Sequence, residues 1–196
     1  MNRYLILLLT VLFLCSCNKA VEGIINSAGN QSPYEYITYT IFKGQQFCDH
    51  NPYKSVETTE MKFYVQFDSS AVYESHLSEN QYDINKLYGF SDNNMDHHKY
   101  SARIGWRWSD GALRLFAYVY NNGEVASKEI TKIDIGTLVK CSIKVNGKSY
   151  LFTVNDSNIQ MNRASTTEKG IGYQLYPYFG GNETAPHDIR IMIKEE

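Results

Sequence analysis

The chain has 196 residues and a formal net charge of −2. Its length suits one domain with a short extension, and its charge balance argues against a general nucleic-acid-binding protein. The 16 tyrosines and 9 phenylalanines favour β-structure, because aromatic side chains pack well on a pleated surface. Beyond the N-terminus, no apolar stretch is long enough to predict a transmembrane helix.

The N-terminus has the pattern of an export signal. Arg3 supplies a positive charge, and the apolar run Tyr4–Leu14 that follows has the length of a secretory signal. Leu14-Cys15-Ser16-Cys17 resembles a bacterial lipobox. That resemblance implies a signal peptide over residues 1–16, a lipid on Cys17, and a location in the cell envelope, with the outer membrane favoured. The alternative is an ordinary secreted protein.

After the signal, residues 17–33 lack a sustained period and are interpreted as a tether, and residues 34–196 as the folded domain. In that domain, apolar and polar residues alternate along most segments, which predicts half-buried strands. The predicted strands are, in chain order, Tyr36–Phe42, Glu60–Asp68, Tyr100–Trp108, Ala112–Asn121, Cys141–Val145, Ser149–Asn155, Gly170–Phe179 and Asp188–Lys194. A helical turn is expected only within Ser69–Leu77.

Turn sequences separate several of these strands. Ser109-Asp110-Gly111, Asn121-Asn122-Gly123 and Asn146-Gly147 each place glycine where a positive φ is expected, and Asn-Gly is typical of a tight hairpin. About nine short strands in one domain predict an all-β fold with two packed antiparallel sheets, a sandwich of the jelly-roll kind.

The strand pattern resembles that of the concanavalin A-like lectins and glucanases. The resemblance covers about Tyr36 to Lys194 and depends on Ser101–Trp108, the hairpin Leu113–Gly123 and the closing segment Tyr176–Ile189. It implies a jelly roll with one curved sheet whose concave face holds a glycan.

Polar and aromatic residues alternate with the apolar ones, and they form the predicted binding face. Tyrosine rings suit the apolar faces of sugars, and arginine suits carboxylate or sulfate groups. The face favours a carbohydrate partner, including an anionic polysaccharide. The alternative is an ordinary solvated sheet surface, in a structural or interaction protein. The predicted ligand-binding residues are Tyr64, Gln66, Arg103, Arg107, Tyr118, Tyr120, Gln174 and Tyr176.

Catalytic signals are sparse. No predicted strand carries the closely spaced carboxylates that retaining glucanases of this fold class use. A polysaccharide lyase needs a residue that moves a proton and a donor that stabilises the substrate carboxylate. Tyr118, His98 and Arg103 are the candidates for those roles, and a binding protein without activity is favoured over the lyase.

Metal and disulfide signals leave alternatives open. Asp92, Asp96 and Asp188 are the candidates for a structural calcium, but the spacing is not that of an EF-hand, and no cofactor is expected. The adjacent His97 and His98 are expected to point in opposite directions, which disfavours a shared ion. If Cys17 is lipidated, Cys48 and Cys141 remain, either as a disulfide or as small core residues.

Overall fold

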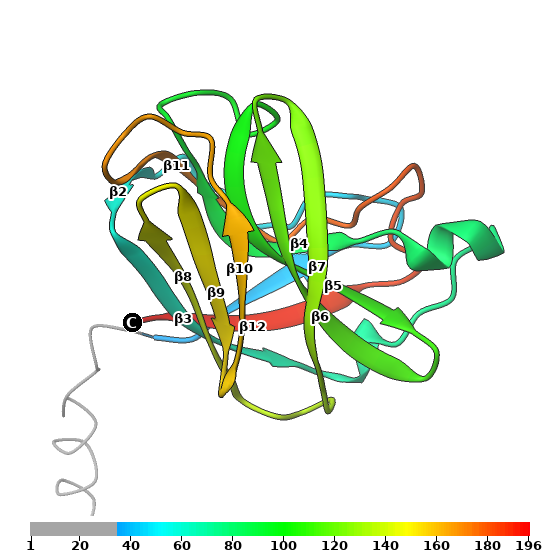
Figure 1. The fold of residues 1–196 in the computed structure, drawn as a ribbon. Helices are drawn as coiled ribbons and strands as arrows, with labels where there is room; N and C mark the ends of the chain where they lie inside the picture. The colour runs from blue at the N-terminus through cyan, green and yellow to red at the C-terminus, as the bar shows by residue number, and fades with distance from the viewer. Residues whose placement is uncertain (1–34) are drawn as a thin grey trace, which may run out of the picture. The chain divides into compact units, whose positions relative to one another are not determined.

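The computed structural model describes residues 35–196, and they form a two-sheet β-sandwich (Figure 1). Every strand pairs antiparallel with its neighbours. The strands are β1 (Ile37–Ile41), β2 (Ser55–Thr58), β3 (Glu60–Phe67), β4 (Asn85–Ser91), β5 (Tyr100–Ser109), β6 (Ala112–Asn121), β7 (Glu124–Ile133), β8 (Val139–Asn146), β9 (Ser149–Val154), β10 (Ser157–Asn162), β11 (Gly170–Leu175) and β12 (Ile189–Glu195). Two short 3₁₀ helices, η1 (Ser69–Ala71) and η2 (Ser78–Tyr82), lie between β3 and β4.

The two sheets have six strands each. The first has the order β1-β12-β3-β8-β9-β10, and the second has the order β2-β11-β4-β5-β6-β7. The predicted fold class, an all-β antiparallel sandwich, is confirmed. The predicted signal, tether and lipidated Cys17 lie outside the described residues. Within residues 35–196, no helix has the length and apolar character needed to cross a membrane.

Tight turns set the register of the second sheet. Asp110 and Gly111 join β5 to β6 with φ of 52° and 67°, and Asn122 and Gly123 join β6 to β7 with φ of 54° and 89°. Positive φ at both turn residues twists the chain in the sense that paired strands require. The predicted turns are therefore confirmed, and they place β5, β6 and β7 side by side.

The hydrophobic core fills the space between the sheets. Trp106 of β5 is fully buried, and its ring centroid lies 5.3 Å from that of Phe67 on β3 in the opposite sheet. Tyr88 of β4 meets Phe63 of β3 at 5.1 Å. Aromatic pairs at these separations add to the stabilisation that burial provides.

The cysteines belong to this core. Cys48 and Cys141 are both buried and both free, so the disulfide alternative is wrong and the core alternative is right. Burial raises the pKa of the Cys48 thiol to about 11, which leaves it protonated and unreactive at neutral pH. The sandwich is held together without a covalent link between these two residues.

Four strands escape prediction because their sequences lack a clear alternation. β7 is polar and exposed along most of its length, and β10 is polar as well. β2 has only four residues. β4 is buried on both faces and contains a register shift between Lys86 and Tyr88, so its apolar residues run together instead of alternating.

Candidate functional site

Arg103 lies at the centre of the outer face of the second sheet. On β5 it alternates with Ala102 and Ile104, which are fully buried in the core, so its side chain projects from the opposite face. Its cross-strand partners are Gly89 on β4 and Tyr118 on β6. The guanidinium therefore lies between a glycine, which has no side chain, and a tyrosine ring.

This arginine is enclosed although it faces outward. Only 8% of its surface is exposed, and burial lowers its pKa to about 10, so it is charged at neutral pH. Within residues 35–196 its guanidinium has no hydrogen-bond acceptor and no carboxylate partner. Arginine is seldom this deeply buried without a counter-charge, because the loss of hydration is costly.

A second cation lies beside Arg103. Lys86 of β4 places its Nζ 4.8 Å from the centroid of the Tyr118 ring and donates a hydrogen bond to the carbonyl oxygen of Ile84 at 2.7 Å. Burial and the nearby charge of Arg103 lower the pKa of Lys86 to about 8. In the described part of the chain, Lys86 also lacks an ion pair, so the face carries two positive charges that no carboxylate neutralises.

Aromatic rings follow one another along this face, and we call the set Tyr53, Tyr173, His97, His98, Tyr120 and Tyr118 the aromatic belt. Successive ring centroids in that order lie 6.1, 6.1, 4.1, 5.4 and 5.9 Å apart. The belt draws residues from the β2 side, β11, the loop between β4 and β5, and β6. Tyrosine and histidine each offer a flat ring with a polar tip. The ring can pack on the apolar face of a sugar, and the tip can form a hydrogen bond with a sugar hydroxyl.

Two glycines on this face leave space beside Arg103 that a side chain would fill. Gly89 pairs with Arg103, and a Cβ there would collide with the backbone of Ala102 and Arg103. Gly105, two residues beyond Arg103 on the same face, would drive a Cβ into Ile84. Ser101, two residues before Arg103, is fully buried, and its Oγ has no hydrogen-bond partner among the described residues. We call Arg103, Lys86, Ser101 and the aromatic belt together the cradle.

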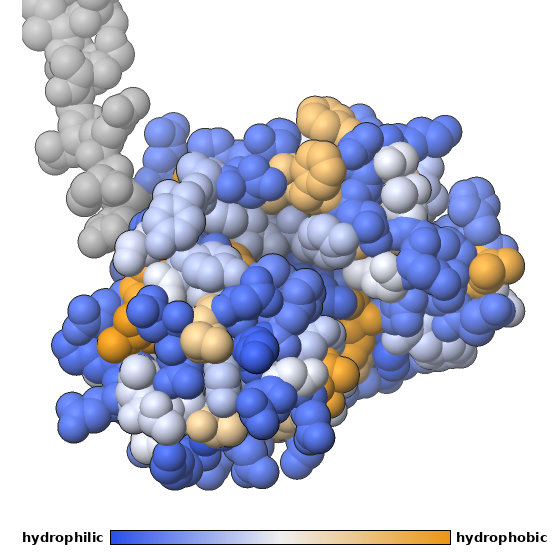
Figure 2. Space-filling view, turned by 90° about the horizontal axis from the view of Figure 1, so that it is seen from above, coloured by the Kyte–Doolittle hydropathy of each residue, from blue (hydrophilic) through white to orange (hydrophobic). Residues whose placement is uncertain are grey.

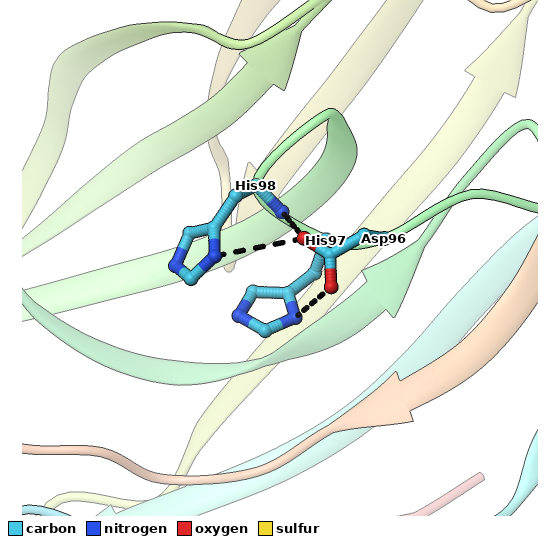
Figure 3. A group of neighbouring side chains, drawn as sticks. All are labelled: Asp96, His97 and His98. Carbon is cyan, nitrogen blue, oxygen red and sulfur yellow. Dashed lines mark hydrogen bonds and ion pairs between the residues drawn. The ribbon is translucent and has the colours of Figure 1, made fainter.

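The loop from Asp92 to Lys99 forms part of the rim of the cradle, and Figure 3 shows the Asp96 carboxylate beside the rings of His97 and His98. The Nδ1 of His97 lies 2.9 Å from the hydroxyl oxygen of Tyr173. Burial first, and the charge of Arg103 second, lower the pKa of His97 to about 4. The imidazole is therefore neutral at physiological pH.

The structure places four of the eight predicted binding residues on this face and three of them in the cradle. Arg103, Tyr118 and Tyr120 belong to the cradle, and the predicted catalytic candidate His98 is in its belt. Arg107 lies on the same face toward the η2 end, but its guanidinium already donates to the carbonyl oxygen of Tyr82 at 2.7 Å and packs on Phe116.

Four predicted residues lie elsewhere. Tyr64 and Gln66 are on β3, in the first sheet, so they cannot share a face with Arg103. Gln174 is buried and donates to the hydroxyl of Tyr88 inside the molecule, and Tyr176 packs against the core. The prediction failed on β11 because the segment from Gly170 to Phe179 has no regular alternation of apolar and polar residues that would show which side chains face outward.

Five cradle residues are absent from the predicted set: Tyr53, Lys86, His97, Ser101 and Tyr173. On β11, Tyr173 is the residue that faces the cradle, where Gln174 and Tyr176 were predicted to do so. The charge of Arg103 contributes to the lowered pKa of His97. Lys86 belongs to a strand that was not predicted at all. Its only sequence signal is a charge directly before the run Leu87–Phe90.

The calcium candidates have other partners. The Asp92 carboxylate is fully buried and accepts hydrogen bonds from Arg163 and Tyr150, so it is not available to a cation. Asp188 accepts from the backbone N–H of Lys43 at 2.8 Å and braces a loop. Asp96 is exposed, but its near neighbours are the two histidine nitrogens and not a set of oxygens, so the site does not suit calcium.

Two cavities lie away from the cradle. One of about 300 Å³ is lined by the β5–β6 turn and the segment from Lys132 to Ile135, and one of about 320 Å³ lies on the β1–β12–β3 side, beside Arg190. Figure 2 shows one end of the molecule as largely hydrophilic, with small and separate apolar patches. Neither cavity contains an unpaired buried charge, so the cradle is the stronger candidate site.

No family model matches the sequence, and no curated protein is significantly similar to it. Solved structures are similar in fold. The alginate lyase AlyC3 aligns with a TM-score of 0.54 at 9% identity, covering 81% of this chain and 72% of the lyase. The glucanase SCLam, a non-specific endo-β-1,3(4)-glucanase, gives 0.51 at 6% identity, covering 84% and 71%. A protein of unknown function from Saccharomyces cerevisiae gives 0.51 at 16%, covering 82% and 85%. At these identities the likeness shows the fold alone: the chain is a jelly-roll sandwich of the type found in lyases and glucanases.

Proposed function

We propose that this protein binds an anionic carbohydrate in the cradle, without cleaving it. One observation carries the proposal: Arg103 is buried, charged and unpaired among the described residues. A carboxylate or sulfate of the ligand supplies the missing counter-charge and accepts two parallel hydrogen bonds from the guanidinium. Lys86 adds a second charge beside it.

The aromatic belt supports a sugar in preference to a small inorganic anion. Its six rings extend from Tyr53 to Tyr118, a length that one small anion does not need. Sugar rings offer apolar faces to aromatic side chains and hydroxyls to the tyrosine tips. The combination of a chain of rings with two cations fits a polymer that repeats both features, such as a uronic-acid or sulfated polysaccharide.

A glycan array tests this proposal directly. We expect the protein to retain uronic-acid or sulfated polysaccharides and to ignore neutral polymers of similar length. Retention should weaken as salt rises, although less than for surface charges, because Arg103 is enclosed. Equal binding to neutral and charged polymers would contradict the proposal, and binding to none would favour a structural or interaction role.

A polysaccharide lyase is the second candidate, and the placing of His97 and Tyr118 on either side of Arg103 favours it. A lyase neutralises the substrate carboxylate, removes the proton at the adjacent carbon and protonates the leaving oxygen. Arg103 suits the first step, the neutral His97 the second and the Tyr118 hydroxyl the third, because burial keeps the pKa of Tyr118 above its usual range. The product carries a new double bond, so a rise in ultraviolet absorbance during incubation distinguishes the lyase from the binding protein.

The cradle does not suit a glycosidase that uses two carboxylates. On this sheet, Asp110 and Glu129 come nearest to such a pair, and both are bound to Arg114 at 3.1 Å. A general acid and a nucleophile must be free to approach the sugar. The function proposed here also includes attachment to a bacterial envelope through Cys17. Mass spectrometry of wild-type protein and a Cys17→Ala variant from the native host tests that part separately.

Binding should depend on pH through Lys86. The pKa of Lys86 is lowered to about 8, so the charge is present below pH 8 and is lost as pH rises above it. We expect affinity for an anionic glycan to fall by about tenfold between pH 7 and pH 9, since one contributing charge is removed. The groups around Lys86 with an electrostatic effect are Arg103, which lowers the pKa, and Asp83, which raises it.

The variant that tests this is Lys86→Met, in which the side chain keeps a similar length but has no charge. It should bind more weakly at pH 7 and should lose most of the pH dependence, as followed by isothermal titration calorimetry at constant ionic strength. A Lys86→Met variant with the same pH profile as the wild type would show that another group is responsible.

A further inference from the structure

The loop between β4 and β5 gathers three side chains of the types that bind metals, and two of them, His97 and His98, also belong to the aromatic belt. One ligand atom each from Asp96, His97 and His98 lies within 4.8 Å of the others. The Nδ1 of His97 is 3.8 Å from one Asp96 carboxylate oxygen, and the Nδ1 of His98 is 3.5 Å from the other. Figure 3 shows both rings on the same side of the chain, with the carboxylate next to them.

This arrangement results from the turn of the backbone. The backbone N–H of Lys99 and that of Tyr100 both donate to the carbonyl oxygen of Asp96, at 2.8 and 3.1 Å. The N–H of His98 donates to the Asp96 carboxylate at 2.8 Å. In an extended strand the two histidines would point in opposite directions, as the sequence suggested. The tight turn instead brings the ring centroids to 4.1 Å.

The spacing is close to what a transition-metal ion requires. Zinc lies about 2.0–2.2 Å from histidine nitrogens and carboxylate oxygens, so tetrahedral donors are about 3.3 Å apart. The measured nitrogen–oxygen separations of 3.5 and 3.8 Å need only small side-chain rotations to reach that value. The turn holds the backbone of the three residues in place, so the loss of backbone entropy on binding a metal is small.

The ligand types select the class of metal. Two imidazoles and one carboxylate suit zinc or copper, whereas calcium and magnesium prefer oxygen ligands. The donors are also accessible, since the Asp96 and His98 side chains are 59% and 68% exposed. The hydroxyl of Tyr173 lies 2.9 Å from the same Nδ1 of His97, so this contact must be given up when the nitrogen binds a metal, and water can complete the coordination.

We propose that Asp96, His97 and His98 form a binding site for a divalent transition-metal ion of the zinc type. The positive charge of Arg103 opposes the binding of a cation, so the site should be weaker than a structural zinc site. The metal site shares His97 and His98 with the aromatic belt but does not include Arg103 or Lys86, so zinc binding is measured without glycan.

Calorimetric titration of zinc chloride into the full chain tests the site, with His98→Ala as the test variant. Wild type should bind one equivalent through this site, and His98→Ala should bind at least tenfold more weakly at that equivalent. His76→Ala is the matched control, because His76 is another exposed histidine and should leave the titration unchanged. Both variants are at the surface and should fold.

Two further measurements decide the assignment. Asp96→Asn keeps the hydrogen-bonding shape of the side chain but weakens the ligand, so it too should lower the affinity. In long-range imidazole NMR spectra, zinc should shift the ring nitrogens of His97 and His98 and leave those of His76 in place. The proposal is overturned if wild type binds no zinc below 1 mM, or if His98→Ala and Asp96→Asn bind as tightly as wild type.

Discussion

Replacing Arg163 with alanine should lower the free energy of unfolding by about 3–5 kcal/mol, the range for breaking a buried ion pair. Arg163 and Asp92 are 2% and 0% exposed at the side chain, and they are joined at 2.8 Å. The same guanidinium donates to the carbonyl oxygens of Thr167 and Lys169 at 2.6 and 3.0 Å. Removing it leaves the buried Asp92 carboxylate without its counter-charge and takes a donor away from the carbonyl groups of Thr167 and Lys169.

The matched control is Arg190→Ala. Arg190 bonds Asp68 at nearly the same distance, 3.0 Å, but their side chains are 54% and 46% exposed. An exposed ion pair contributes little, so the change should cost less than about 1 kcal/mol. Urea denaturation of both variants measures the difference. Similar losses in the two would show that burial does not set the strength of the Arg163 contact.

The pH dependence of this pair has a definite sign. Burial alone would raise the pKa of Asp92, but the hydrogen bonds from Arg163 and Tyr150 and the charge of Arg163 outweigh it and lower the pKa. The contribution is present above the ordinary carboxyl pKa of about 4 and is lost as pH falls through the lower folded-state value. Wild type should therefore lose more stability than Arg163→Ala on acidification.

Replacing Arg103 with methionine should have the opposite effect on stability and a large effect on binding. Affinity for an anionic polysaccharide should fall at least tenfold, because the enclosed guanidinium of the cradle is removed. Stability should stay the same or rise, since methionine fills similar space without the cost of desolvating a charge. Binding that falls while stability holds is typical of a residue retained for its function.

Calorimetry with the polysaccharide and thermal unfolding of the same samples measure both quantities. Arg107→Met is the control, because Arg107 is on the same face but is already held by Tyr82 and Ser109. It should change affinity by less than about threefold. An Arg103→Met protein that binds as well as wild type, or that unfolds at room temperature, would refute the assignment of Arg103 to glycan binding.

The sequence predicted the fold well where local chemistry decides it. The alternation in Tyr100–Trp108 and Ala112–Asn121 and the Asp-Gly and Asn-Gly turns specify a hairpin by themselves, and both strands and turns are confirmed. Strands failed where tertiary contacts decide, as in β7, a polar strand that exists because β6 pairs with it.

The candidate site was predicted only in part, for a related reason. Alternation shows which residues of one strand share a face, so Arg103 and Tyr118 were placed correctly. It does not show which sheet a strand joins, and Tyr64 was therefore assigned to the wrong one. The burial of Arg103 depends on the loop with His97 and on Tyr173, which are distant in sequence, so no local pattern could indicate it.

The position of β12 has a consequence for how the chain acquires its structure. β12 contains residues Ile189–Glu195 at the end of the chain, yet it lies between β1 and β3 in the first sheet. Within residues 35–196, β1 pairs with no strand other than β12, so its pairing depends on a segment that is distant along the chain. Such distant pairing makes folding slow, and deletion of the final eight residues should remove the seam of the sheet and leave a chain that cannot complete it.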